Sequence, residues 1–456
     1  MSHPDLALSQ PREGLTSSER RALVAVLLGV ALATLDTAIA NTALPTIAAD
    51  LHSPAAASVW IINAYQLTMV ASLLPFAALG DLLGPRRVYL GGLAVFTAAS
   101  LACALSPTLA FLTGARALQG VGGGAMMSVN VALIRLIYPP ARLGRGVGMN
   151  ALVVGIGFAV GPTIASLVLA AASWPWLFGL NVPLGLLALA VAYSALPQNA
   201  HHGRAFDPVT ALLTAVCFSA LIFTLTSVAQ WQSRAQILSS LALACASGTA
   251  LLIRERGHAS PMLPVDLLRR PMFALSTITA IAAFAAQGLA FVSLPFYFEE
   301  VLHRNPINTG FLMTAWPVVV AAAAPFAGRL SDKYAPGLLG GIGLAILCLG
   351  EAALALLPAA PSAGRIVVYL AICGAGFGMF QAPNLRALMS SAPPERSGGA
   401  SGVIAIARLI GQTTGAALVA MCFHYAGVEG SALALALGSL SAGLASLASF
   451  ARIWAY

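Results

Sequence analysis

The chain has 456 residues, a formal net charge of +8 at pH 7, 59% hydrophobic residues and only 8% charged residues. Ordinary soluble domains carry about 25% charged residues, so this composition excludes a soluble globular protein and indicates an integral membrane protein. The positive charge does not indicate a nucleic-acid partner, because no basic cluster falls on a soluble domain.

Apolar stretches of about 20 residues, the length that crosses the hydrocarbon core of a bilayer, recur along the chain. They predict an all-α membrane protein with fourteen transmembrane helices. The stretches lie at 22–48, 57–79, 88–106, 108–134, 146–172, 175–196, 208–229, 236–253, 273–295, 309–327, 337–357, 365–383, 400–423 and 431–452. The first is too long for a cleavable signal peptide, so we expect it to be retained.

The two ends of the chain resemble each other. A shift of 254 residues aligns Asn130 with Asn384, and a shift of 251 aligns Asp81 with Asp332. Long self-similarity in an apolar chain is typical of secondary transporters, whose halves rock about a central site. The predicted division is an N-terminal tail at 1–21, a six-helix bundle at 22–200, two inserted helices at 201–258 and a second six-helix bundle at 259–456.

The basic residues predict the orientation in the membrane, because Lys and Arg collect in short cytoplasmic loops. Most of them, including Arg21, Arg254 and Arg452, fall on one side of a fourteen-span arrangement, and only Arg234, Arg304 and Arg365 fall in loops on the other. We therefore expect a multi-pass protein of the cytoplasmic (inner) membrane with both termini in the cytoplasm.

Several function classes have no support in the sequence. The six cysteines lie inside the apolar stretches without metal-ligand spacing, so we interpret them as packing residues. A GxxxxGK[ST] motif is absent, which argues against direct ATP drive. No loop is long enough for a catalytic domain, and no nucleophile with its base is recognisable. We expect no metal, no cofactor and no enzymatic activity.

Asp36 lies about midway along the first apolar stretch. A carboxylate at the bilayer centre costs about 2.5–3.5 kcal/mol on insertion scales, so it is tolerated mainly where it faces a cavity or a partner. The helical wheel groups it with the small residues Ala33 and Ala40, while Thr34, Thr37 and Asn41 lie on another face. The pattern favours a functional carboxylate over one that only ties neighbouring helices together.

Arg116 is the only basic residue well inside the first six stretches. It lies at a depth similar to that of Asp36. Burial would disfavour a charged carboxyl and a nearby guanidinium would favour it, so a carboxyl balanced between the two could exchange a proton. The alternative is a static ion pair that holds the bundle together.

The fifth stretch contains Gly157, Gly161 and Pro162. A GxxxG pattern by itself indicates only that two helices approach closely. Helix packing is therefore the default interpretation, and a role in sealing the transport path is the sharper one.

A charged loop follows the second stretch and recurs in the second half. Its acid, Asp81, could cap the next helix or pair with Arg86 and Arg87, while Gly84 permits a tight turn. Asp332 stands in the copy. The duplication favours a latch that holds one conformation over an ordinary solvated loop.

Five polar residues are candidates for the substrate cavity. They are Asn41, Asn63, Gln66, Gln287 and Glu351. Gln287 stands where the first half has Asp36, so the halves cannot contribute equally to protonation. Glu351 either attracts cationic cargo or is solvated near the outer surface. With so few acids in the membrane, lipophilic monocations or weakly polar compounds are easier cargo than dications.

These residues resemble a known family, the major facilitator superfamily, and within it the fourteen-helix drug:proton antiporter branch. The resemblance covers essentially the whole chain. The segments that carry it are Asp36–Pro45, Ala77–Val88, Arg116–Gly120, Gly155–Pro162, Trp174–Gly185, Gly374–Gly378 and Gln381–Asn384. Ala77 and Pro85 depart from the usual loop motif, in which glycine and a base are common, and put the strength of the latch in doubt.

The resemblance implies two six-helix bundles with two extra helices between them, and a proton antiporter that exports drug-like molecules and so confers antibiotic resistance. It implies Asp36 and Arg116 as proton-coupling residues and the proton gradient as the energy source. The expected partners are a small-molecule substrate, protons and the lipid bilayer, and we expect a monomer. The alternatives are a proton-coupled transporter of a specific metabolite and a non-transporting membrane sensor.

Overall fold

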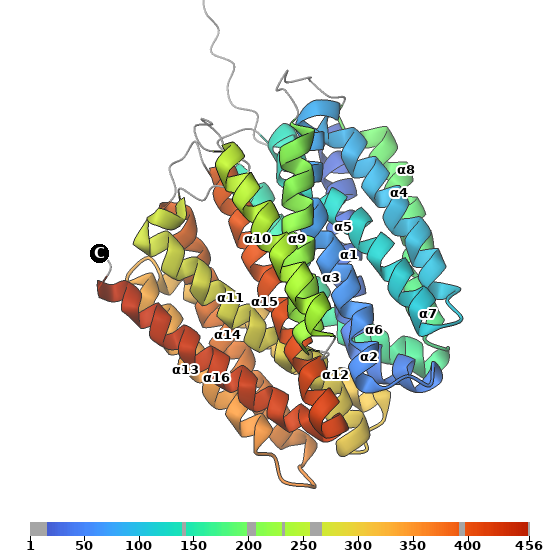
Figure 1. Cartoon of the computed structure of the whole chain (residues 1–456), viewed down its shortest axis with the longest axis vertical. Coiled ribbons are helices and arrows are strands. Elements are labelled where there is room, and N and C mark those ends of the chain that lie inside the picture. The colour runs from blue at the N-terminus through green and yellow to red at the C-terminus, as the bar shows by residue number, and fades with distance from the viewer. Residues whose placement is uncertain are drawn as a thin grey trace, which may run out of the picture.

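The computed structural model describes residues 16–138, 143–197, 207–229, 233–255, 267–391 and 397–454, and the regular elements in these ranges are helices (Figure 1). The α-helices of the first half are α1 (Ser17–Asp50), α2 (Ala55–Ser58), α3 (Trp60–Leu83), α4 (Pro85–Ala104), α5 (Leu109–Ile137), α6 (Leu143–Ala171), α7 (Pro175–Gly179) and α8 (Asn181–Ala195). They are followed by α9 (Pro208–Ala229), α10 (Arg234–Glu255), α11 (Pro271–Phe296), α12 (Pro306–Leu330), α13 (Pro336–Ala355), α14 (Ala363–Ser391), α15 (Ser397–Ala426) and α16 (Gly430–Ala451).

Local sequence explains where many helices begin. Thr16 forms a capping box at the start of α1, in which its hydroxyl accepts from the Glu19 backbone N–H at 3.2 Å while its own N–H donates to the Glu19 carboxylate at 2.7 Å. Proline occupies the first turn of α4, α7, α11, α12 and α13, where the missing N–H costs nothing. Gly84 before α4 has φ 90°, a conformation that favours glycine, so the predicted tight turn is confirmed.

The number of membrane spans differs from the expected fourteen. By length and apolar composition, twelve segments of the described residues qualify as candidate spans, so the count of fourteen is not confirmed. Gly402–Ala451 counts as one span although it contains parts of both α15 and α16, and α9 contributes only the shorter apolar stretch Pro208–Leu221. Helix ends lie near the predicted ones, except that α14 runs past residue 383 to Ser391. A helix can continue past the end of its apolar stretch into polar residues, and hydropathy alone does not predict where it ends.

The helices pack as two groups in sequence order. Within the first, α5 contacts α3 and α4, and α1 contacts α6 and α8; within the second, α14 contacts α12 and α13, and α11 contacts α15 and α16. Helices α9 and α10 pack against each other, and α9 also contacts α3 and α15. Figure 1 shows this green pair at the front, between the blue and cyan helices and the orange and red ones. Asp207 joins the pair by binding Arg254 at 2.8 and 3.2 Å, and this hydrogen-bonded pairing holds the pKa of Asp207 well below its usual range.

The groups meet at the end of the molecule where α1 finishes, which is the predicted outer end. The Thr163 and Thr314 hydroxyls lie 2.7 Å apart between α6 and α12, and the Ser166 hydroxyl donates to the carbonyl of Pro306 at 3.2 Å. A buried apolar cluster spans the same region. Its members include Ile39, Ala43, Leu44 and Ile47 of α1, Leu289, Val292 and Phe296 of α11, and Val419 and Phe423 of α15.

Arg452, which the sequence groups with the basic residues of the cytoplasmic side, is not exposed. Its side chain is fully buried, and Nη1 donates to Ser276 Oγ at 3.0 Å and to Asn384 Oδ1 at 2.6 Å. Nη2 also donates to the Ser449 hydroxyl. This arginine thus ties α11, α14 and α16 together at the predicted cytoplasmic end of α16.

Candidate functional site

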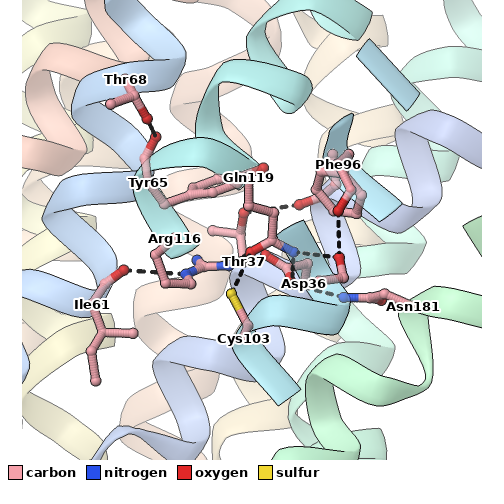
Figure 2. Close-up of polar contacts among 12 residues, drawn as sticks. Asp36, Thr37, Ile61, Tyr65, Thr68, Phe96, Cys103, Arg116, Gln119 and Asn181 are labelled. Atoms are coloured by element: carbon pink, nitrogen blue, oxygen red, sulfur yellow. Dashed lines mark hydrogen bonds and ion pairs between the residues drawn. The ribbon is translucent and has the colours of Figure 1, made fainter. Parts of the chain in front are cut away.

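Asp36 lies at the centre of a buried polar network in the first half (Figure 2). Its Oδ2 accepts from Arg116 Nη1 at 2.5 Å, and both side chains are 1% exposed. Its Oδ1 accepts from Gln119 Nε2 and from Asn181 Nδ2, both at 2.8 Å. Three N–H donors therefore converge on the carboxylate from α5 and α8, an arrangement that suits the ionised form.

Arg116 is held by more than its carboxylate partner. Nε donates to the carbonyl of Ile61 at 3.2 Å, and Nη1 also donates to Gln119 Oε1 at 2.5 Å. The guanidinium carbon lies 4.3 Å from the Tyr65 ring centroid and 5.5 Å from that of Phe178. The aromatic faces and the fixed donor fork hold the cation in a dry environment.

Gln119 connects the ion pair to α4. Its Nε2 donates to Ser100 Oγ at 2.8 Å as well as to Asp36, and its Oε1 is 3.7 Å from the Cys103 sulfur. Ser100 in turn donates to the carbonyl of Phe96 at 2.8 Å. A change in the charge of Asp36 would therefore alter hydrogen bonds in α4, α5 and α8 together.

The sequence prediction found the two charged members of this network and missed the neutral ones. Gln119 and Asn181 lie in segments that carry the family resemblance but have no role assigned to them there, and Tyr65 is not singled out by the sequence. Gln119 follows Arg116 by three residues, which puts both on one helix face, so it could have been found. Nothing local to Asn181 or Ser100 indicates that their helices turn toward Asp36.

A small cavity of about 40 Å³ lies beside the network, between the two halves. Its wall is built from α1, α3, α5, α6 and α15. The lining residues are Ala33, Thr34, Thr37, Tyr65, Gln66, Met69, Met127, Val154, Phe158, Arg408, Leu409 and Gln412. Sites for small molecules usually have about 300–1,000 Å³, so this cavity has room for a water molecule but must expand to admit a drug-sized compound.

The predicted cavity residues fall in different places. Gln66 lines the cavity, and its Oε1 accepts from the Thr413 hydroxyl of the second half at 3.1 Å. Gln287 is outside the lining and accepts from Gln412 Nε2 at 3.3 Å, so it can orient a lining residue.

Asn41 and Asn63 are buried but do not line the cavity. Among the described residues, Asn41 Oδ1 and both polar atoms of the Asn63 side chain have no hydrogen-bond partner. Their predicted place in the cavity wall is therefore wrong in this conformation.

Glu351 is neither in the cavity nor solvated near the surface, so both predicted placements are wrong. Its side chain is fully buried in α13, and neither carboxylate oxygen has a hydrogen-bond partner among the described residues. A Cβ on Gly438 of α16 would lie 2.3 Å from Oε2, which places the carboxyl between two helices of the second half. The depth of Glu351 was predicted from its position along the helix, but that position does not reveal which way the side chain points.

Gly157 and Gly161 bring α6 against α1 on either side of Asp36. A Cβ at Gly157 would lie 3.0 Å from Thr34 Cγ2, and one at Gly161 would lie 2.4 Å from the Cβ of Ala38. The carbonyl of Pro162 instead faces α12, 2.4 Å from where Gly310 would carry a Cβ. The packing interpretation of these residues agrees with the contacts.

The duplicated loops differ from each other. Asp81 is exposed and does not cap α4, whose N-cap is Gly84 without a side-chain bond. Arg86 donates to the carbonyl of Tyr193 at 2.5 Å, and Arg87 is exposed. In the second half, Asp332 forms an exposed ion pair with Arg386 of α14. Among the described residues, the copy therefore contains an acid–base pair, whereas Asp81 forms no ion pair.

Two further acids, which the sequence did not single out, lie at the predicted outer end. Glu299 and Glu300 belong to a π-helical turn, Tyr297–Val301, and line a surface cavity of about 550 Å³. The Thr46 hydroxyl of α1 is 3.5 Å from Glu299 Oε2. These acids therefore lie where the two halves meet.

Known proteins resemble the chain along most of its length. The family model described as Major Facilitator Superfamily matches residues 26–416. The chain is 48% identical over 444 residues to the uncharacterized transporter YebQ of Escherichia coli (strain K12), with 97% of each chain covered. It is 29% identical over 403 residues to the riboflavin transporter RibZ of Clostridioides difficile (strain 630), covering 88% of this chain and 87% of that one.

The chain is also similar to a protein named for drug resistance and to a transporter of known structure. The multidrug resistance protein Stp of Mycobacterium tuberculosis (strain CDC 1551 / Oshkosh) is 31% identical over 403 residues, with 87% of this chain and 74% of that one covered. A solved bacterial homologue of the human lysosomal transporter Spinster, inward-facing and unoccupied, aligns with a TM-score of 0.71 at 13% identity, covering 97% of this chain and 98% of that one. At this identity the likeness shows the fold alone.

Proposed function

Because the chain belongs to the Major Facilitator Superfamily and is a multi-pass membrane transporter, we propose that it is a proton-coupled antiporter that exports drug-like small molecules across the cytoplasmic membrane by alternating access. The observation that carries this proposal is the buried Asp36–Arg116 ion pair beside a cavity lined by both halves. The resemblance to a multidrug resistance protein supports export.

The network suggests how a proton would be coupled to movement. Protonation of Asp36 removes the negative charge that partners Arg116, and a buried cation without a partner is strongly unfavourable. Arg116 and Gln119 must then find other partners or meet water, which requires α1, α4 and α5 to shift. The shift would reach the cavity through Tyr65, whose ring lies under the Arg116 guanidinium and also lines the cavity.

The fourteen-helix branch is part of the proposal. Helices α15 and α16 are separated by the short 3₁₀ turn Gly427–Glu429, and each is long enough to cross the membrane. Helix α9 has 22 residues, the length of a membrane span, and packs against α10. Counting α9, α15 and α16 separately gives fourteen crossings and two cytoplasmic termini.

The present conformation fits the outward-closed half of the cycle. At the predicted outer end α6 meets α12 and α1 meets α11, while α15 also contacts α3 beside the central cavity. We infer that the cavity reaches the cytoplasm when the opposite ends separate.

The test compares Asp36→Asn with the natural chain in everted vesicles. Asn keeps the size of the side chain but cannot titrate, so exchange of cargo between equal pools should continue while uphill transport driven by a pH gradient is lost. Retention of uphill transport would place the essential proton site elsewhere. Loss of both activities in correctly inserted protein would show that Asp36 serves translocation itself.

A specific metabolite remains the second candidate cargo, because one relative is named as a riboflavin transporter. Counterflow with a panel of dyes, biocides and metabolites separates the two. A drug exporter should exchange several unrelated compounds, whereas a metabolite transporter should exchange one compound and its close analogues.

A further inference from the structure

Arg408 of α15 is a second membrane-embedded arginine, and the ion-pair chemistry of Asp36 does not use it. It lines the central cavity, one helical turn from Gln412 on the same face. Its Nε is buried and has no hydrogen-bond partner among the described residues, and it forms no ion pair with them. A cation placed in a membrane cavity without a carboxylate marks a functional site by default.

The acid nearest to the cavity is not available to Arg408. Asp36 already accepts hydrogen bonds from Arg116, Gln119 and Asn181. Tyr65 presents its ring to the Arg116 guanidinium and also contributes to the cavity wall. Among the described residues that line the cavity, Arg408 alone carries a charge. The net charge of the cavity wall is therefore positive.

The rest of the lining suits an amphipathic molecule. Thr34, Thr37, Gln66 and Gln412 supply hydroxyl and amide groups. On the apolar side, Met69, Met127, Val154, Phe158 and Leu409 line the same cavity. Flexible methionines and an aromatic ring accept apolar bodies of varied shape.

We propose that Arg408 is the anchor for an anionic group of the cargo and that the site selects organic anions, such as carboxylates on an aromatic body. The guanidinium fork matches a carboxylate through two parallel hydrogen bonds. This inference rests on the proposed transport function, and it replaces the cationic or weakly polar cargo expected from the sequence by an anionic one. Expansion of the cavity during the cycle would let the body of the anion contact the methionines while its carboxylate remains on Arg408.

The test measures binding and transport with three aromatic dyes of similar xanthene core: fluorescein as the anion, a fluorescein monoether monoester as the uncharged fluorescent analogue, and rhodamine 6G as the cation. Binding is followed by fluorescence polarisation with the full chain in lipid nanodiscs at pH 8, without a pH gradient. The variants are Arg408→Gln and Arg408→Lys. Arg234→Gln, at the exposed start of α10, is the matched control for loss of one arginine.

We expect Arg408→Gln to weaken fluorescein binding at least about tenfold, the effect of losing a charge-assisted bond, and to change binding of the neutral dye less than about twofold. Arg408→Lys should retain part of the affinity, and Arg234→Gln all of it. Equal losses for anionic and neutral dyes, or no loss for either, would overturn the assignment. If Arg408→Gln fails to fold, the natural chain still decides, because a preference for the neutral or cationic dye over fluorescein contradicts the proposal.

Transport of the three dyes into everted vesicles distinguishes failure of this inference from failure of the proposed function. A lack of pH-gradient-driven transport of every dye in the natural chain counts against the antiporter. Gradient-driven transport that does not respond to Arg408→Gln counts against the anion site alone.

Discussion

Single residues decide whether the Asp36–Arg116 pair is a coupling device or a static brace. Lysine keeps a positive charge but has neither the planar fork nor the flat surface that stacks on Tyr65. It cannot satisfy Asp36, Gln119 and the Ile61 carbonyl in the geometry that Arg116 adopts. The charge and the geometry of the pair are therefore separable by substitution.

We predict that Arg116→Lys inserts into the membrane but transports at least about tenfold more slowly under an imposed pH gradient, since a misplaced charge costs at least about 1.4 kcal/mol. Uptake into everted vesicles measures the rate, and Arg234→Lys is the control. A rate within twofold of the natural chain would show that only the charge of Arg116 matters.

The carboxyl of Glu351 fills the space beside Gly438, between α13 and α16. Gly438 leaves the space that its carboxyl occupies, because a Cβ there would lie 2.3 Å from Oε2. Crowding a packed interior typically costs about 1–3 kcal/mol.

We predict that Gly438→Ala lowers the thermal stability of the detergent-solubilised protein and that Glu351→Ala partly restores it in the double variant. Unfolding followed by the accessibility of buried cysteines provides the measurement, and the coupling between the two sites is read from the double-mutant cycle. Additive effects would show that the two residues do not share this space.

The charged residues of the site could be predicted from the sequence, but their neighbours could not. Asp36 and Arg116 stand out because charge inside an apolar span is rare. Arg408 and Glu351 are equally rare by that measure, yet their surroundings depend on how helices rotate against their neighbours. Burial of Arg452, the last residue of its apolar stretch, also follows from tertiary contacts with Ser276 and Asn384, which no local pattern encodes.

At the scale of the helices, α6 serves both halves. Its glycines Gly157 and Gly161 face α1, and its Pro162 carbonyl faces α12. The sequence predicts a close helix contact from GxxxG, but the partner of each face comes only from the fold. Rotation of α6 would therefore change the contacts of α1 near Asp36.

We predict that Gly161→Val impairs transport and lowers stability, because its Cβ would lie 2.4 Å from that of Ala38 and bulk at a close helix contact forces the helices apart. Gly155→Val in the same helix is the matched control, since a Cβ there meets nothing within 4 Å. Transport and thermal unfolding are measured for both. Similar behaviour of the two variants would contradict the packing role of Gly161.

At the scale of the whole molecule, the proposed export requires the two halves to part at the outer end. The spans and the duplicated halves could be expected from hydropathy and repeats, but which ends touch depends on the packing of α1, α6, α11 and α12. The hydroxyls of Thr163 and Thr314 lie 2.7 Å apart across this contact.

We predict that a disulfide between cysteines introduced by Thr163→Cys and Thr314→Cys blocks transport, because it holds the outer end closed. Reduction should restore transport, and each single variant treated with the same oxidant is the control. Normal transport by the fully cross-linked protein would exclude separation of α6 from α12 during the cycle.

The central claim is that Asp36 is the proton site linked to cargo. The most direct measurement is proton release, recorded with a pH indicator in weakly buffered detergent solution, when a dye that the natural chain transports is added. The natural chain should release protons on binding, and Asp36→Asn should bind the same dye without releasing them. Release from Asp36→Asn equal to that of the natural chain would contradict the claim.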